Sequence, residues 1–401
     1  MRSLRLAHLT TVDMSLELLL GTELSVDVAA GHTVFGISAP GPYVEQVEAR
    51  GVTHVPLPAL TRSWGPRHDM AAARQLARVL RHLDLDVLHT HNPKTGVFGR
   101  AVGRMLNVPV VVNTCHGLWM KPEDHWWKKS AVLAIEALAA QWSHVELYQN
   151  DADRRALRPA VPTRRSRTVG NGVDLTRFTR DDAARARLRA ELGVGPHEVL
   201  VGGVGRRVAE KGIHEFVHAA RALSGRATFV WIGATDHDKP DVCADNSSGV
   251  RWLGLRSDMP AVYSALDVFT LPSHREGFSR SAMEAAACGC ALVLSDIRGC
   301  REIGAHDEHV LLVPPRHPSA LTAALTRLLT DPTLRGRLAT AARERAHEAF
   351  DQRAVAGISL NTYRDAMCGR SIHPSTRTAL TFEGRDRESW ERPREHRPNQ
   401  L

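Results

Sequence analysis

Short apolar runs typical of buried strands alternate with longer helix-like segments along most of this chain, and this alternation constrains its fold more than any other feature. The strand-like runs span residues 6–9, 32–37, 55–57, 87–89, 108–114 and 145–148 in the first half, and 199–204, 228–232, 250–253, 268–271, 291–294 and 310–313 in the second. Helix-like segments lie between them, notably at 70–82 and 129–141. Because strands that alternate with helices favour parallel sheets covered by helices, the sequence predicts an α/β fold.

The chain is long enough for two such units. Its 401 residues, 43% of them hydrophobic, can form two ordinary domains with separate cores. A Pro- and Arg-rich stretch at 159–167 interrupts the pattern, so we place the first domain at 1–165 and the second at 166–346. Residues 369–401 are polar and lack periodicity, which predicts a disordered tail.

Two carboxylates, Glu276 and Glu284, lie eight residues apart, after the strand-like run at 268–271 and at the start of an alanine-rich helical segment. A carboxylate at a strand end, followed by a helix start, presents hydrogen-bond acceptors beside an anion-binding helix N-terminus. If the segment is mostly helical, eight residues rise by roughly 12 Å, so the two carboxylates would contact different parts of an extended ligand. The alternative is a surface helix with two solvated glutamates.

Two cations, Arg206 and Lys211, follow the first strand-like run of the second domain. Parallel sheets bind ligands beyond the carboxyl ends of their strands, so these cations are candidates for neutralising a diphosphate; a solvated loop is the alternative. The nearby glycines do not complete a dinucleotide-binding fingerprint, because Val208 occupies the third glycine position. A phosphate-binding Gly-Lys-Ser/Thr loop is also missing from the sequence, which argues against NAD and ATP as ligands.

Several short segments, taken together, resemble the retaining nucleotide-sugar glycosyltransferases of family 4 and cover roughly residues 1–366 in the family's order. The segments are Glu276-Gly277-Phe278 with Glu284, Gly205-Arg206 with Lys211-Gly212, Asn171-Gly172-Val173-Asp174 with Phe178, His116-Gly117, and residues 86–94. The segment at 86–94 is similar to members that build bacterial surface polysaccharides and lipid-linked oligosaccharides. The resemblance implies the GT-B fold, in which two Rossmann-like domains face each other across a cleft and a final helix, here 347–366, crosses back to the first domain.

The resemblance also implies roles for individual residues. Arg206 and Lys211 would bind the donor diphosphate and stabilise the charge that builds as the sugar leaves. Glu276 would bind hydroxyls of the donor sugar, Glu284 would bind the ribose, and His116 would contact the transferred sugar.

Backbone N–H groups at the start of the helical segment are further candidates for the diphosphate. They belong to Gly277, Phe278 and Ser279. Helix N-termini bind anions in this way, because their first N–H groups lack partners within the helix.

The first loop departs from the family pattern. It reads Thr-Thr-Val-Asp-Met-Ser at residues 10–15, where many members have a glycine-rich loop. The resemblance therefore does not identify the first-domain groups that meet the acceptor and the diphosphate. Asp13, His91 and Lys94 are candidates for acceptor contact, and Asn171 is a candidate for ordering the hinge between the domains.

An aromatic and basic segment predicts contact with a membrane surface. It contains Trp119, Trp126, Trp127, Lys128 and Lys129, and indole rings and lysines suit the headgroup region of an anionic bilayer. The alternative is that the indoles pack internally or shape an acceptor pocket. The net charge of +8 fits anionic ligands or lipid and is spread along the chain, so we expect no nucleic-acid partner.

The sequence shows no signal peptide and no apolar run of about 20 residues, so we expect a cytoplasmic protein that contacts the membrane peripherally. The resemblance implies that no metal or other cofactor is needed. Asp-x-Asp spacings occur at 84/86, 151/153 and 236/238, outside the family motifs, and we interpret all three as solvated.

The leading hypothesis is a retaining glycosyltransferase that moves a sugar from a nucleotide-sugar donor, with a UDP-sugar favoured, to a lipid-linked or polysaccharide acceptor. One alternative is the same chemistry on a soluble small molecule of secondary metabolism. Others are a nucleotide-sugar epimerase or hydrolase on the same fold, and a binding protein without catalytic activity.

Overall fold

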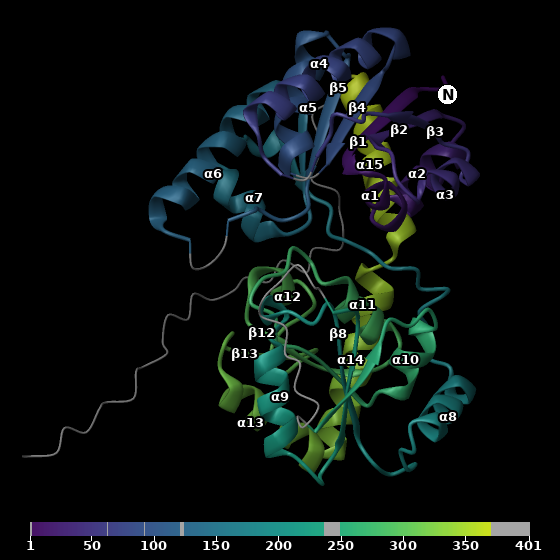
Figure 1. The fold of residues 1–401 in the computed structure, drawn as a ribbon, viewed down its shortest axis with the longest axis vertical. Coiled ribbons are helices and arrows are strands. Elements are labelled where there is room, and N and C mark those ends of the chain that lie inside the picture. Colours follow the sequence, from purple (N-terminus) through teal and green to yellow (C-terminus); the bar gives the residue numbers. More distant parts are fainter. Residues whose placement is uncertain (1, 62, 92, 121–123, 236–248, 370–401) are drawn as a thin grey trace, which may run out of the picture.

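A computed structural model describes residues 2–61, 63–91, 93–120, 124–235 and 249–369 of the chain. These residues form two parallel sheets, each packed against helices, which belong to two Rossmann-like domains (Figure 1). The first sheet has the strand order β3-β2-β1-β4-β5-β6-β7, and the second has the order β10-β9-β8-β11-β12-β13. The predicted α/β fold with two Rossmann-like domains is therefore confirmed.

The first domain is built from the following elements, in chain order: β1 (Arg5–Val12), α1 (Asp13–Leu18), α2 (Gly21–Ala29), β2 (Thr33–Ala39), α3 (Val44–Ala49), β3 (Thr53–Pro56), α4 (Pro66–Leu83), β4 (Val87–His91), α5 (Pro93–Met105), β5 (Val110–Cys115), α6 (Trp126–Ala139), β6 (Val145–Tyr148), α7 (Asp151–Leu157) and β7 (Ser166–Thr168). All six predicted strand-like runs of this half fall on strands. The short strand β7 pairs with β6, so the first sheet extends three residues past the predicted domain boundary at 165.

The second domain follows the same alternation: α8 (Asp182–Glu191), β8 (Leu200–Val204), α9 (Ile213–Ala222), β9 (Thr228–Ile232), β10 (Val250–Gly254), α10 (Met259–Ala265), β11 (Val268–Leu271), α11 (Arg280–Ala287), β12 (Ala291–Ser295), α12 (Arg298–Arg301), β13 (Leu311–Val313), α13 (Pro318–Thr330) and α14 (Pro332–Ala349). Strands β9, β11 and β12 are buried along their whole length. Helices cover both faces of such central strands, which explains why the strands read as continuous apolar runs instead of alternating ones.

The final helix, α15 (Gln352–Met367), returns to the first domain, where Leu360 and Tyr363 pack with Leu6 and Val87 (Figure 1). The prediction of one helix at 347–366 is wrong in detail, because the chain breaks between α14 and α15. Phe350 stays in the core of the second domain, and Asp351 begins α15 by accepting a hydrogen bond from the backbone N–H of Arg353 at 2.8 Å.

The chain passes between the domains twice, and the two crossings lie side by side. Val173 on the first crossing donates its backbone N–H to the carbonyl of Phe350 at 2.8 Å and accepts from Gln352 at 3.2 Å. A Cβ atom on Gly172 would lie 2.5 Å from the Cα atom of Gln352, so only glycine permits this approach. Of the predicted disordered tail, residues 370–401 lie outside the described part of the chain.

Candidate active site

A cavity of about 290 Å³ lies between the two domains. The first domain lines it with residues 17–23 and His116, and the second domain with Arg177, Phe178 and Arg280. Asn171, on the first crossing, lines it as well. Of the predicted site residues, only His116 and Asn171 line this cavity, and the cations Arg177 and Arg280 were missed by the sequence prediction.

Lys211 and Glu276 meet at the carboxyl ends of the neighbouring strands β8 and β11. The Lys211 Nζ atom lies 2.5 Å from the Glu276 Oε1 atom. Gly212, which follows the lysine, has a φ of +74°, and a Cβ atom there would lie 2.1 Å from the carbonyl oxygen of Pro272. The turn therefore requires glycine, and it holds Lys211 against the end of β11. Arg206 follows β8 directly and is exposed.

Glu284 lies on α11, which begins at Arg280. Residues 276–279 are therefore not helical. The Glu284 Oε2 atom accepts a hydrogen bond from the Tyr263 hydroxyl at 2.8 Å. Burial raises the pKa of Glu284, and the hydrogen bond from Tyr263 and the charges of Arg280 and Arg177 only partly offset that effect. The two predicted carboxylates thus have different environments: Glu276 forms an ion pair with Lys211, whereas Glu284 accepts a hydrogen bond from the Tyr263 hydroxyl.

The segment 277–279 fits a backbone role better than a side-chain role. The Phe278 ring is buried and packs edge-on against Phe350, with the ring centres 5.7 Å apart. The Ser279 Oγ atom caps α11 by accepting from the backbone N–H of Ala282 at 3.3 Å. Gly277 makes the close approach, since a Cβ atom there would lie 2.2 Å from the carbonyl oxygen of His116.

His116 follows β5 and therefore contacts the second domain directly through Gly277. Its Nε2 atom lies 3.0 Å from the Nδ1 atom of His91, and its own Nδ1 atom is hidden without a hydrogen-bond partner among the described residues. Burial lowers the pKa of His116 to about 4, so the ring is neutral at neutral pH.

Asp13 and Lys94 do not line the cavity. Both carboxylate oxygens of Asp13 accept backbone N–H groups, from Met14 at 2.8 Å and from Tyr43 at 2.7 Å. The Lys94 ammonium is buried, donates to the carbonyl of Ser63 at 2.7 Å and pairs with Asp69 at 2.5 Å. Each of these side chains orders a loop of the first domain.

The interpretation of the Asp-x-Asp pairs as solvated is wrong for two of their members. Asp86 is buried and pairs with Arg2 at 2.7 Å. Asp153 is 1% exposed, accepts the backbone N–H of Leu118 at 2.9 Å and pairs with Arg298 of the second domain at 2.5 Å. These carboxylates are held by protein partners, while the pair at 236/238 lies outside the described residues.

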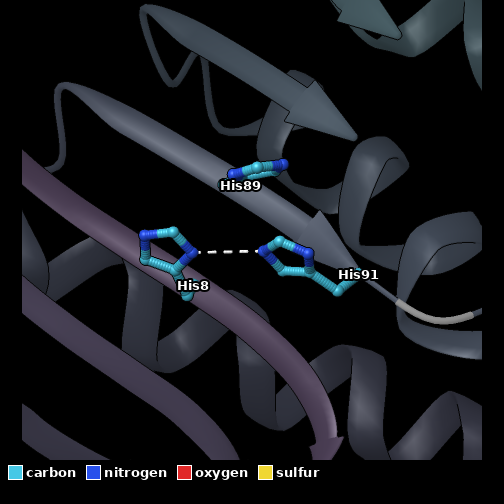
Figure 2. A group of neighbouring side chains, drawn as sticks. All are labelled: His8, His89 and His91. Carbon is cyan, nitrogen blue, oxygen red and sulfur yellow. Dashed lines mark hydrogen bonds between the residues drawn. The ribbon is translucent and has the colours of Figure 1, made fainter. Parts of the chain in front are cut away.

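One group of described side chains has the spacing to hold a metal ion. His8, His89 and His91 have ring nitrogens within 4.8 Å of one another, on the adjacent strands β1 and β4 (Figure 2). Both nitrogens of each ring already have a protein partner. His8 is hydrogen-bonded to Asp27 and His91. His89 is hydrogen-bonded to Tyr363 and Thr114. His91 is hydrogen-bonded to His8 and His116. We therefore interpret this group as a hydrogen-bonded network.

Two Rossmann-like domains with a cavity between them, and with cations and carboxylates at the strand ends, define the GT-B architecture. Residues 28–177 match the family described as Glycosyltransferase Family 4, and residues 198–331 match Glycosyl transferases group 1. A D-inositol 3-phosphate glycosyltransferase from Frankia alni is 30% identical in an alignment of 323 positions that covers 72% of this chain and 76% of that protein. The chain belongs to the family 4 glycosyltransferases, and it is an enzyme.

Other relatives and solved structures agree with this assignment. An N,N'-diacetylbacillosaminyl-diphospho-undecaprenol alpha-1,3-N-acetylgalactosaminyltransferase from Campylobacter jejuni is 28% identical over 72% of this chain and 79% of its own. The structure of HepE from Anabaena in complex with UDP has a TM-score of 0.76 at 19% identity, covering 90% of this chain and 100% of that one. Sucrose-phosphate synthase from Thermosynechococcus elongatus has a TM-score of 0.78 at 21% identity, with 92% and 100% covered. These two structures support the GT-B fold.

Proposed function

We propose that this enzyme transfers a sugar from a UDP-sugar to a lipid-linked acceptor, with retention of configuration at the transferred carbon. The observation that carries the proposal is the ion pair between Lys211 and Glu276. It lies next to Gly277, which packs against the backbone of His116 from the opposite domain. Relatives support the acceptor class, since the enzyme from Campylobacter jejuni and a galactosyltransferase from Escherichia coli are both named for diphospho-undecaprenol substrates. Solved neighbours in complex with UDP and with UDP-glucose support the donor class.

In the proposed mechanism the protein positions the reactants and stabilises charge. Arg206 and Lys211 neutralise the donor diphosphate as the bond to the sugar breaks. Glu276 is then shared between Lys211 and the sugar hydroxyls, and Glu284 binds the ribose. The acceptor hydroxyl attacks from the face that the diphosphate leaves, and the leaving phosphate accepts its proton.

Donor entry requires the domains to separate. His116 and Gly277 are packed so closely that even one added methyl group would clash. A sugar between these two residues needs the space that this contact occupies, so we propose that the described arrangement is the closed state and that an open state admits the donor.

We further propose that α6 contacts the membrane surface. Trp126 and Trp127 are 72% and 59% exposed, and Ile135 and Leu138 of the same helix are 39% and 60% exposed. Trp119 is not part of this surface, because it is partly buried and its indole donates to Glu136 at 3.3 Å. No helix in the described part of the chain is both long and apolar enough to cross a bilayer.

The test of the catalytic proposal is transfer from UDP-sugars by the Arg206→Ala, Lys211→Ala double variant. We expect transfer to fall by orders of magnitude, since one fixed electrostatic donor contributes roughly 3 kcal/mol to the transition state. The matched control is Arg207→Ala, because the Arg207 guanidinium lies over the Trp252 ring at 4.0 Å. Double-variant activity within a few-fold of wild type would contradict the proposal.

Three further arms of the same assay separate the alternatives. Transfer to undecaprenyl-diphosphate sugars in vesicles supports the lipid-linked acceptor. Transfer to D-inositol 3-phosphate instead would favour a soluble acceptor, the substrate named for the Frankia alni relative. Donor consumption without any acceptor would indicate an epimerase or hydrolase. We also propose that no metal or other cofactor is required, and transfer should then persist in EDTA.

A further inference from the structure

A continuous chain of hydrogen bonds runs from His116 into the core of the first domain. The Nε2 atom of His116 lies 3.0 Å from Nδ1 of His91, and Nε2 of His91 lies 3.1 Å from Nδ1 of His8. The chain ends where Nε2 of His8 lies 2.9 Å from a carboxylate oxygen of Asp27 on α2 (Figure 2 shows the His8–His91 link). His8, His91 and Asp27 are fully buried.

Local strand geometry produces this alignment. Residues 89 and 91 lie on the same face of β4, because side chains alternate along a strand. His8 on β1 is in register with His89, which brings it next to both histidines of β4. His116 follows β5, the next strand of the sheet, and its ring centre lies 5.3 Å from that of His91.

The hydrogens in this chain allow only two ordered patterns. The Asp27 carboxylate accepts hydrogen bonds, so Nε2 of His8 carries the hydrogen of that bond. If all three rings are neutral, each Nε2 donates to the next residue and the terminal Nδ1 of His116 is an acceptor. If His8 is an imidazolium, its Nδ1 donates to His91, His91 donates to His116, and the terminal Nδ1 carries a hydrogen and is a donor.

We propose that Asp27, His8 and His91 form a proton relay that sets whether Nδ1 of His116 donates or accepts a hydrogen bond towards the ligand. This inference rests on the proposed function, because the ligand is the donor or acceptor sugar. His116 lines the cavity and its Nδ1 atom has no partner among the described residues. A ligand that enters in the proposed open state is therefore the available partner. His8 and His91 are positioning residues, since each acts through His116.

The two patterns differ by one proton. A proton that binds to Nδ1 of His116 displaces the Nε2 hydrogen to His91, which in turn passes its own to His8. The added charge therefore comes to rest on His8, beside Asp27 and away from the ligand. No bond other than N–H bonds forms or breaks.

The charged groups around His8 favour that location for the charge. Helix α2 contributes Asp27 and Glu23, strand β4 contributes His89 and His91, and α15 contributes Tyr363. Burial opposes the charge on His8, but the hydrogen bond to Asp27 and the charges of Asp27 and Glu23 outweigh it and raise the pKa of His8. Burial and neighbouring histidines hold the pKa of His91 well below its ordinary value.

His89 provides a matched control. It is as buried as His8 and its ring centre is 4.0 Å from that of His91. Its nitrogens, however, are bonded to the Tyr363 hydroxyl at 2.6 Å and to the Thr114 hydroxyl at 2.7 Å, so it is outside the relay. Substituting His89 disturbs the same cluster without cutting the chain.

The experiment is a pH titration of histidine ring nitrogens by NMR on the ¹⁵N-histidine-labelled, ligand-free protein. His116→Asn assigns the His116 signal by its loss. We expect the His116 ring to change tautomer at the pH where His8 titrates, with a midpoint above 6.5. Asp27→Asn should shift that shared midpoint to lower pH, and His89→Asn should leave it in place.

Two results would overturn the relay. One is a His116 ring that keeps a single tautomer while His8 titrates, which the wild-type protein alone can show even if Asp27→Asn fails to fold. The other is stoichiometric binding of Zn²⁺ that removes the ring N–H signals of His8 and His91, because the group would then be a metal site.

Calorimetry with UDP-glucose separates this inference from the proposed function. At the midpoint pH of His8, binding that fixes Nδ1 of His116 as a hydrogen-bond donor should take up about half a proton, and binding that fixes it as an acceptor should release about half a proton. Measurements on the wild type in two buffers of different ionisation enthalpy detect either change. No binding of UDP-glucose, with the NMR linkage intact, would count against the proposed donor and leave the relay standing. Binding at that pH with neither proton uptake nor proton release would contradict the relay's contact with the ligand.

Discussion

The carboxyl group of Glu284 accepts a hydrogen bond from Tyr263 at 2.8 Å, and burial raises its pKa. A carboxyl group whose pKa is raised in the folded state opposes folding once it is ionised, so its charge costs stability at neutral pH. The same charge is the feature that would bind the two ribose hydroxyls. Under the proposed function, the ionised Glu284 therefore favours nucleotide binding and disfavours folding.

Glu284→Gln should weaken UDP binding about 10- to 100-fold, because a hydrogen bond to a charged group contributes roughly 1.5–3 kcal/mol. Its unfolding temperature should stay equal or rise, since the amide can still accept from Tyr263. Calorimetry and thermal unfolding measure the two effects. Tyr263→Phe is the control: it keeps the carboxylate, so UDP affinity should persist while stability falls. A Gln variant that loses stability and keeps its affinity would contradict this view.

The sequence predicted where several candidate side chains lie in the fold but not the partners of their polar groups. Lys211 and Glu276 could be predicted because strand ends bring them to one edge of the sheet. Lys94 and Asp153 could not be assigned, because their partners Asp69 and Arg298 lie 25 and 145 positions away in the chain, and nothing local marks those contacts. Asp27 was missed for the same reason: its contact with His8 depends on how α2 packs against β1.

At the scale of elements, the proposed membrane contact depends on the exposed side of α6. The exposed large apolar residues of this helix are Trp126, Trp127, Ile135 and Leu138, while Glu136 is buried and paired with Arg100 at 2.6 Å. The buried ion pair fixes the rotation of the helix about its axis, and so determines which residues remain exposed.

Trp126→Ser with Trp127→Ser should lower partitioning onto phosphatidylglycerol vesicles at least about tenfold, because burying one large apolar side chain contributes roughly 1.5–3 kcal/mol. Sedimentation with vesicles measures this directly. The matched control is Leu255→Ser, which removes a 79% exposed apolar residue from the second domain. Equal partitioning of both variants and wild type would exclude α6 as the contact surface.

The sequence predicted most elements well and short polar ones poorly. All twelve strand-like runs fall on strands, and the clearest runs belong to β9, β11 and β12, which are buried along their whole length. The strand β7 was missed because its sequence, Ser-Arg-Thr, has no apolar residue, and only pairing with β6 makes it a strand. The break between α14 and α15 was missed because Phe350 is held by a tertiary contact with Phe278.

At the scale of the whole molecule, the four clustered histidines make stability depend on pH. Burial holds the pKa values of His89, His91 and His116 below 6.5, that of His116 at about 4, whereas the pKa of His8 is raised. Below pH 6.5 the unfolded chain protonates all four, but the native state protonates only His8. The free energy of unfolding therefore decreases as pH falls from 6.5, because the three neutral histidines take up protons only in the unfolded chain. The stabilisation from His8 is lost only as pH rises through its raised pKa.

Unfolding free energy should thus fall between pH 6.5 and about pH 5, with these three histidines contributing up to roughly 4 kcal/mol per pH unit. Urea titrations across that range measure the slope. His89→Asn removes one of the three, so its slope should be about 1.4 kcal/mol per pH unit shallower. A variant slope identical to wild type would show that His89 is not held neutral.

The ion pair between Arg298 and Asp153 should hold the two domains in the closed arrangement. Arg298→Ala leaves the Asp153 carboxylate buried without its partner from the second domain, which shifts the balance towards the open state by about 2 kcal/mol, the low end for such pairs because Arg298 is 32% exposed. Small-angle X-ray scattering of the ligand-free protein should show a larger radius of gyration. The control is Arg301→Ala, on the same helix as Arg298. It removes an exposed ion pair with Asp296 and should leave the radius of gyration unchanged.

The return of α15 to the first domain also affects how the protein is made. Leu360 and Tyr363 complete a core whose other members include Leu4, Leu6 and Val110, more than 240 positions earlier in the chain. Domains fold during synthesis as their residues leave the ribosome, at about 5–20 residues per second. The first domain is therefore translated first but completes its core last. The apolar face that α15 covers stays exposed for roughly 10–40 seconds while the second domain is translated. A chaperone that holds nascent chains is most useful to this protein in that interval.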